Sequence, residues 1–322
     1  ARTAGARMTA AAARQGARIE VIAPSGAHLS LDAFDAALAA LRVRGHSVRC
    51  HVAREAWQRF SGTDDARLEQ IHRAARATDI DAVMIARGGY GLSRLLDRID
   101  WALVAASATR GVRWIGYSDF TAFQLALLAR TGAPSFAGPG VSGDFGVAQP
   151  DEFMLAHFDA LMAGSLLPVR WVEQHPAGAP RLVEAVEGTI WGGNLSLVAG
   201  AVGTPWLPDV EDGLLFLEDV SEHPYRIERM LHQLMYAGVL ARQRAIVLGA
   251  FTDWKAAPHD NGYGLASVVE YFRSRVSVPI VTGLPFGHVA RKAVLGVGMH
   301  YRLSLEADSE SDEATIARLV PA

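Results

Sequence analysis

Residues 112–130, VRWIGYSDFTAFQLALLAR, hold a short apolar strand, a polar turn and an apolar helix in direct succession. Residues 112–115 are mostly apolar, as expected of a strand buried in a parallel sheet. Apolar side chains recur at helical spacing over residues 120–128. Ser118 and Asp119 lie between strand and helix, beside helix N–H groups that favour developing negative charge. The pattern allows two interpretations: Ser118 or Asp119 is only a helix cap, or Ser118 is a nucleophile exposed at the sheet edge.

The residues around this stretch alternate between strand and helix patterns. Strand patterns occur at residues 18–23, 47–52, 82–86, 113–117 and 134–137. Helix patterns occur at residues 31–43, 63–77, 120–128 and 151–162, and one more helix leads toward Leu96. Alternation at this spacing is typical of a parallel sheet covered by helices on both faces. Residues 18–163 are therefore predicted to form an α/β domain.

The pattern changes after residue 163. Residues 164–180 are rich in proline and are predicted to be an irregular interdomain linker. Residues 181–322 are predicted to form a second, smaller and β-rich domain, with an acidic, solvated turn at 306–313. Its strand candidates are residues 182–186, 188–191, 213–217, 245–250, 280–282, 293–295 and 301–305. One helix is expected after Asn194 and another over residues 224–236.

The composition excludes several classes of protein. The 322 residues include 31 basic and 34 acidic side chains, which gives a net charge of -3. A nucleic-acid-binding protein usually has an excess of positive charge, and this chain has none. Cys50 is the single cysteine, so an intrachain disulfide and a cysteine-based zinc site are impossible. No apolar run approaches the roughly 20 residues that span a membrane. Residues 1–17, rich in Ala and Arg, are expected to be a disordered tail rather than a signal peptide, and we expect a cytoplasmic protein.

A glycine-rich segment, RGGYG at residues 87–91, follows a predicted strand. It matches neither the P-loop nor the dinucleotide-binding pattern. A tight turn is one interpretation. The other is that the backbone amide of Gly88 or Gly89 forms part of an oxyanion hole, because this loop and Ser118 both follow parallel strands and so share one edge of the sheet.

A nucleophilic serine needs a base, and the base needs an orienting acid. Of the 11 histidines, His288 lies in a glycine-flanked loop directly after an apolar strand, where it is suited to acid–base work or is a plain surface residue. The apolar strand at 214–217 ends in Glu218 and Asp219, and a carboxylate at the end of a buried strand needs a partner. Either acid could orient the histidine, or Glu218 could pair with an arginine of the next helix.

The sequence contains little that resembles a metal-binding motif. His223, His232 and Glu228 do not form an HExxH motif, and no carboxylate array suits magnesium. We therefore expect neither a metal nor another cofactor. Asn194 is interpreted first as a helix N-cap and second as a substrate contact.

Seven short motifs together resemble the LD-carboxypeptidase family of serine peptidases. They are IAPSG (22–26), ARGGYG (86–91), GYSD (116–119), GGNLS (192–196), LEDV (217–220), YRIERML (225–231) and FGH (286–288). They follow the family's order along nearly the whole chain. One departure is Glu228, where the family is expected to carry aspartate.

The resemblance implies a fold and a set of site residues. It implies a Rossmann-like or flavodoxin-like N-terminal domain, a smaller β-rich C-terminal domain and an active site between them. It also implies a catalytic triad of Ser118, Glu218 and His288, and so selects Glu218 over Asp219. For a triad placed in this way we expect the oxyanion hole to use backbone amides of Asp119 and of Gly88 or Gly89, and we expect Arg87, Tyr90 and Asn194 to contact the substrate.

The implied activity is hydrolysis of the L,D bond between meso-diaminopimelate and the terminal D-alanine of cytoplasmic murein tetrapeptides, by a homodimeric enzyme of peptidoglycan recycling. Two alternatives stay open. One is a peptidase of the related microcin-immunity branch, which cleaves an amide between a peptide or amino acid and a nucleotide. The other is a muropeptide-binding protein without catalytic activity.

Overall fold

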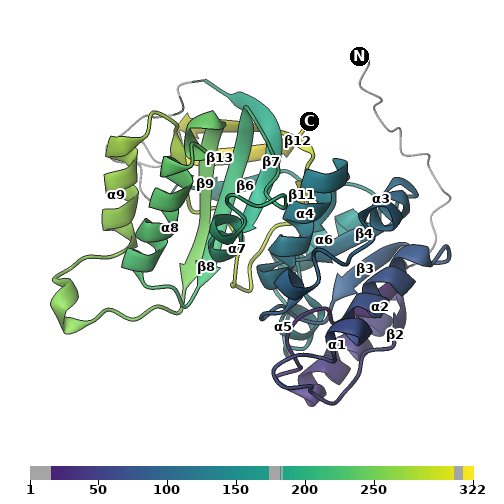
Figure 1. The fold of residues 1–322 in the computed structure, drawn as a ribbon. Helices are drawn as coiled ribbons and strands as arrows, with labels where there is room; N and C mark the ends of the chain where they lie inside the picture. The colour runs from purple at the N-terminus through teal and green to yellow at the C-terminus, as the bar shows by residue number, and fades with distance from the viewer. Residues whose placement is uncertain (1–15, 174–181, 183, 308–314) are drawn as a thin grey trace.

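The computed structural model describes residues 16–173, 182, 184–307 and 315–322. It contains two sheets, one in each half of the molecule (Figure 1). The predicted fold class, an α/β domain with a parallel sheet followed by a strand-rich second domain, is confirmed. The predicted tail, apart from residues 16 and 17, and most of the predicted acidic turn lie outside the described residues.

The first sheet has the strand order β11-β5-β4-β3-β1-β2. Its five strands from the N-terminal half run parallel. They are β1 (Arg18–Ile22), β2 (Ser47–Cys50), β3 (Ala82–Ile85), β4 (Arg113–Gly116) and β5 (Ser135–Ala137). One core packs α2 (Asp64–Arg76), α3 (Trp101–Thr109) and α4 (Thr121–Thr131) against this sheet. A second core packs α1 (Leu31–Val43), α5 (Val141–Phe145) and α6 (Glu152–Met162) on the other face.

Side-chain caps explain where several of these helices begin. The hydroxyl of Ser30 accepts a hydrogen bond from the amide of Ala33 at the start of α1. Thr63 caps α2 and Asp151 caps α6 in the same way. Each cap satisfies an amide that the helix itself leaves unpaired, so these boundaries are set by local sequence.

The second sheet has the order β10-β9-β8-β7-β12-β13-β6. Four of its strands are parallel: β7 (Val186–Asn194), β8 (Gly213–Val220), β9 (Gln243–Thr252) and β10 (Ile280–Thr282). Three pair antiparallel: β12 (His300–Ala307), β13 (Thr315–Pro321) and β6 (Val169–Val172). The apolar faces of α7 (Leu195–Gly200), α8 (Pro224–Tyr236) and α9 (Leu265–Arg275) pack on the parallel part.

Helix α4 lies between the two halves of the molecule. Its residues Thr121–Leu127 are all buried, as expected of a helix with apolar contacts on every side. Phe123 packs in the first domain, whereas Leu125 belongs to the core of the second. The hydroxyl of Thr121 also accepts a 3.0 Å hydrogen bond from the amide of Asn194, at the end of β7.

The structure corrects the predicted linker at residues 164–180. Residues 169–172 form β6, which pairs with β13 as an outer strand of the second sheet. Val169 and Trp171 are buried and alternate with exposed residues, a pattern that four residues are too short to reveal in sequence. Residues 174–180 of the predicted linker lie outside the described residues.

One strand of the predicted second domain belongs to the first sheet instead. The predicted strand at 293–295 is β11 (Leu295–Val297), which pairs antiparallel with β5 and so extends the first sheet. Of the separate strand predicted at 182–186, residue 183 lies outside the described residues, residues 182, 184 and 185 are not in a strand, and Val186 is the first residue of β7. Helices α3 and α9 were not predicted.

His157 on α6 makes the stability of the fold depend on pH. Its ring is 2% exposed, and its Nδ1 accepts a hydrogen bond from the amide of Val294, just before β11. Burial lowers the pKa of His157 to about 4, below its ordinary value of 6.5. Between these two values the unfolded chain binds a proton that the native chain does not, so acidification favours unfolding.

We predict that the free energy of unfolding falls as the pH drops from 6.5 to 4, with His157 contributing of the order of 2 kcal/mol. His157→Gln should flatten this dependence, because glutamine does not titrate. Urea unfolding at several pH values would measure it. The exposed His51→Gln control should leave the slope unchanged, and an equal slope in His157→Gln would contradict the assignment.

Candidate active site

Ser118 follows β4 and starts a one-turn 3-10 helix, Ser118–Phe120, that leads directly into α4. Its φ of +63° lies in the left-handed region that a non-glycine residue rarely adopts. Strain of this kind is often found at functional sites. A side chain at Gly116 would come within 2.9 Å of Phe120 and Ile85, so the tight turn depends on glycine there.

Ser118, His288 and Glu218 form a continuous chain of polar contacts. His288 Nε2 lies 3.0 Å from Ser118 Oγ. His288 Nδ1 lies 2.8 Å from Glu218 Oε2. Glu218 is fully buried, and His288 is partly exposed. This is the geometry of a nucleophile, a general base and an orienting acid.

The two domains contribute different members of this chain. Ser118 follows a strand of the first sheet, whereas Glu218 lies on β8 of the second. His288 lies in the loop after β10. Gly287, with a φ of +129°, has no space for a side chain, because a Cβ there would lie 3.0 Å from Glu218 Oε2. The glycine beside His288 therefore lets the loop approach Glu218 closely.

The two adjacent acids that the residue pattern left as rivals have separate partners. Glu218 points to the imidazole. Asp219 accepts hydrogen bonds from the amide and hydroxyl of Ser196, at 2.9 and 2.6 Å, in the first turn of α7. Asn194 Nδ2 lies 3.3 Å from Glu218 Oε1 and 2.9 Å from Asp219 Oδ1. The buried Asn194 thereby holds both carboxylates, and its own oxygen caps α7 as predicted.

The glycine-rich loop lies against the nucleophile. A Cβ at Gly88 would lie 2.7 Å from Ser118 Oγ and 3.3 Å from the amide nitrogen of Asp119. Gly89 has a φ of +102° and is exposed. The carbonyl of Gly88 accepts a 3.1 Å hydrogen bond from the amide of Gly26. Gly88 and the backbone amide of Asp119 therefore lie close to the side chain of Ser118, whereas Gly89 lies against Gly26 and Arg87.

The side chain of Asp119 connects this loop to the turn of the nucleophile. It is buried and accepts hydrogen bonds from Ser25 Oγ at 2.7 Å and from the amide of Leu92 at 2.9 Å. Burial raises the pKa of this carboxyl, and the two hydrogen bonds oppose that shift. The sequence suggested a cap or an amide donor at this position, and did not reveal this carboxylate contact.

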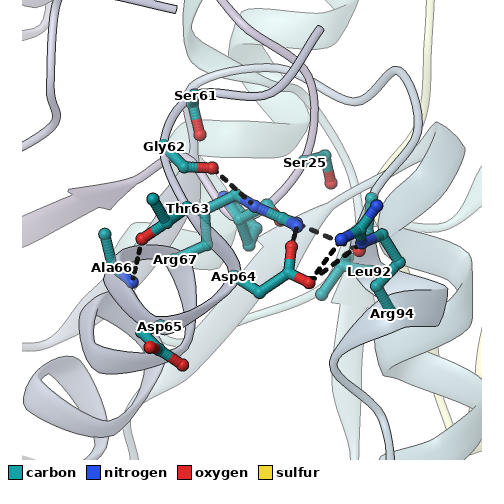
Figure 2. A network of polar contacts seen from close by, with 12 residues as sticks. Ser25, Ser61, Gly62, Thr63, Asp64, Asp65, Ala66, Arg67, Leu92 and Arg94 are labelled. Atoms are coloured by element: carbon teal, nitrogen blue, oxygen red, sulfur yellow. Dashed lines mark hydrogen bonds and ion pairs between the residues drawn. The ribbon is translucent and has the colours of Figure 1, made fainter. Parts of the chain in front are cut away.

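Arg67 on α2 is a further buried group that sequence reasoning missed (Figure 2). Its side chain is fully buried, and burial lowers its pKa. Its guanidinium donates to the carbonyls of Pro24 at 2.5 Å and Gly91 at 3.0 Å, and it pairs with Asp64. Asp64 also pairs with Arg94 at 2.7 Å, as Figure 2 shows. One arginine therefore joins the loop after β1 to the end of the glycine-rich loop.

The remaining predicted substrate contacts lie around the same loop. Arg87 is partly buried and donates to the carbonyl of Ala27 at 2.7 Å. Tyr90 is 45% exposed, with the guanidinium of Arg59 5.8 Å from its ring centroid. Asn194 is directed at Glu218 and Asp219, which gives it a positioning role.

The described residues contain no group of three or more histidine, cysteine, aspartate or glutamate side chains that could hold a metal ion. The same part of the chain contains no helix long and apolar enough to cross a membrane.

We predict that Arg67→Lys lowers the free energy of unfolding by about 3 kcal/mol, because a single ammonium cannot replace charge-assisted hydrogen bonds to several carbonyls. Denaturant unfolding would measure the change. As a control, Arg98→Lys alters an exposed ion pair with Asp65 and should cost less than about 0.5 kcal/mol. Equal stability of the two variants would show that the Arg67 contacts contribute little.

Two family models match the two halves of the chain. Residues 19–138 match the model of the LD-carboxypeptidase N-terminal domain, and residues 187–303 match that of the C-terminal domain. The murein tetrapeptide carboxypeptidase of Pseudomonas aeruginosa is 34% identical over 288 residues, 85% of this chain and 89% of that protein.

Solved structures and a second curated relative extend the comparison. The muramoyltetrapeptide carboxypeptidase from Oxalobacter formigenes is 40% identical, with a TM-score of 0.83 over 94% of this chain and 99% of that one. The microcin C7 self-immunity protein MccF of Escherichia coli is more distant, at 25% identity over 79% of each chain. The matched domains and the extent of these similarities show that the chain belongs to the LD-carboxypeptidase family of serine-type carboxypeptidases.

Proposed function

We propose that this protein is a cytoplasmic LD-carboxypeptidase that removes the terminal D-alanine from murein tetrapeptides during peptidoglycan recycling. The bond cleaved would be the L,D bond between meso-diaminopimelate and D-alanine. The observation that carries the proposal is the hydrogen-bonded chain Ser118–His288–Glu218, with contacts of 3.0 and 2.8 Å. The relatives named for murein or muramoyl tetrapeptides support the substrate class. We further propose that the protein is a homodimer.

In the proposed acylation step, Ser118 Oγ attacks the carbonyl carbon of the scissile bond while His288 Nε2 accepts its proton. Glu218 accepts a hydrogen bond from His288 Nδ1–H, which fixes the tautomer and stabilises the imidazolium. Backbone N–H groups of Asp119 and of Gly88 or Gly89 would stabilise the oxyanion. The imidazolium then protonates the leaving amine of D-alanine, and water hydrolyses the acyl-enzyme with His288 again acting as base.

A carboxypeptidase must also bind the terminal carboxylate of its substrate, and Arg87 is the candidate. Within the described residues, neither Arg87 nor the nearby Arg59 forms an ion pair with a carboxylate. Burial and the positive charge of Arg59 both lower the pKa of Arg87, so an incoming anion would relieve an unfavourable environment. Gly26 and Gly89 line the guanidinium, since a Cβ at either position would lie 2.8 or 3.4 Å from it.

The second candidate function is hydrolysis of a peptidyl- or aminoacyl-nucleotide amide. The similarity to MccF supports this candidate, because MccF is a microcin C7 self-immunity protein and matches this chain over 79% of its length. A tetrapeptide assay and a nucleotide-conjugate assay on the same preparation would separate the two. A muropeptide binder without activity would show affinity for tetrapeptide and no release of D-alanine.

We predict that Ser118→Ala reduces D-alanine release from a murein tetrapeptide by at least about 1,000-fold with the fold intact, because the nucleophile is lost. His288→Ala should have a similar effect. Mass spectrometry of the products would measure it, with Ser274→Ala on α9 as the active control. Substantial activity in Ser118→Ala, or activity that chelators abolish, would refute the serine mechanism.

We predict that Arg87→Met removes selectivity for a free terminal carboxylate. In the parent, kcat/KM for the tetrapeptide should exceed that for its C-terminal amide by about 100-fold, because only the acid pairs with arginine. In Arg87→Met this ratio should fall toward one. The matched control is Arg54→Met, which removes an exposed arginine paired with Asp35. A retained ratio would exclude Arg87 as the carboxylate contact.

A further inference from the structure

The loop that carries His288 passes from one domain to the other. It leaves β10 of the second sheet at Thr282 and ends where β11 pairs with β5 of the first sheet. Lys292, four residues after His288, is buried, with 1% of its side chain exposed. Its Nζ lies 2.6 Å from Asp144 Oδ1 on α5 of the first domain. Asp144 Oδ2 accepts a hydrogen bond from the amide of Gly140 at 2.8 Å.

The same ammonium also contacts the residue before the nucleophile. Lys292 Nζ lies 3.9 Å from the centroid of the Tyr117 ring, within the range of a cation–π contact. The Tyr117 ring centroid lies 5.0 Å from that of His288, at an interplanar angle of 59°. The cation, the tyrosine ring and the imidazole of the base are thus in successive contact, and Tyr117 is bonded to Ser118.

Stability alone gives a weak reason for a buried ion pair at this place. Removing two charges from water carries a large cost in free energy, and apolar replacements of buried pairs are often neutral or stabilising. The loop has other anchors: β11 pairs with β5, the amide of Ala293 donates to the carbonyl of Pro285, and Arg291 packs on the ring of Phe153 at 4.1 Å. The Lys292–Asp144 pair adds a defined position for the Lys292 ammonium against the ring of Tyr117.

We propose that the Lys292–Asp144 pair positions His288 against Ser118, acting through the ring of Tyr117. Asp144 holds Lys292 to the first domain, and Lys292 holds the loop of the base and the tyrosine ring in one arrangement. All three are positioning residues. The proposal rests on the serine mechanism proposed above, and it concerns the rate of the chemical step rather than substrate affinity.

The test uses the full-length protein with Lys292 and Asp144 replaced together, K292M/D144N. This change leaves no unpaired buried charge, and the asparagine oxygen still accepts from Gly140. We expect kcat for D-alanine release to fall 10- to 100-fold, KM to change less than twofold, and the thermal midpoint to stay within a few degrees of the parent. The rate at which a small fluorophosphonate labels Ser118 should fall by the same factor as kcat, because labelling needs the Ser–His contact and no substrate pocket.

A second variant, Tyr117→Leu, tests the contact through the tyrosine ring. It still provides a test of the proposal if K292M/D144N fails to fold. It should show the same loss of kcat and of labelling. In a double-mutant cycle the combined variant should lose little more than either alone, because both changes break one linkage. Parental kcat and labelling in K292M/D144N or in Tyr117→Leu, or additive losses in the cycle, would overturn the proposal.

Asp81→Asn serves as the control. It breaks the ion pair with Arg18 at the opposite end of the sheet and should leave kcat and labelling at parental values. The labelling assay also separates this proposal from the proposed function. A parent that is labelled at Ser118 but does not cleave tetrapeptide would refute the substrate, while the dependence of labelling on Lys292 would still decide the positioning role.

Discussion

The candidate site depends on a 3.0 Å contact between Ser118 and His288, two residues that are 170 positions apart in sequence and come from different domains. A hydrogen bond of this kind is lost if the domains shift by an ångström or two. Several features of the fold reduce that freedom. Helix α4 is buried between the domains, β11 of the C-terminal half pairs with β5, and Thr121 is hydrogen-bonded to Asn194. The domain interface therefore determines the geometry of the candidate active site.

The site is built from buried polar groups, each with an assigned partner. Glu218 is held by Asn194 and His288, and Asp119 by Ser25 and the amide of Leu92. Arg67 is surrounded by backbone carbonyls and Asp64. Burying such groups without partners would cost several kcal/mol each, so alternative arrangements of these loops are strongly disfavoured. This gives a rigid frame around the partly exposed His288.

Local sequence was sufficient to predict most elements, and it left the residues of the candidate triad among several alternatives. The boundaries of α1 and α8 agree with those predicted, since caps and apolar periodicity are local signals. By contrast, β6 and β11 are too short to carry a periodicity of their own, and their sheets are chosen by tertiary pairing. The choice of Glu218 over Asp219 came from family resemblance. Arg67 and Lys292 were missed, because a charged residue on a helix or loop is normally solvated, and nothing nearby in sequence marks these two as buried.

The position of β11 has a consequence for the order in which the chain folds. The edge of β5 is covered by residues 295–297, more than 150 positions later in the chain. A nascent chain that has completed the first five strands therefore exposes an unpaired strand edge while the rest is still being synthesised, and such edges favour aberrant pairing. The first sheet can be completed only after most of the second domain has been synthesised. The segment that supplies its last strand also carries His288, so one return of the chain both covers the edge of β5 and places His288 beside Ser118.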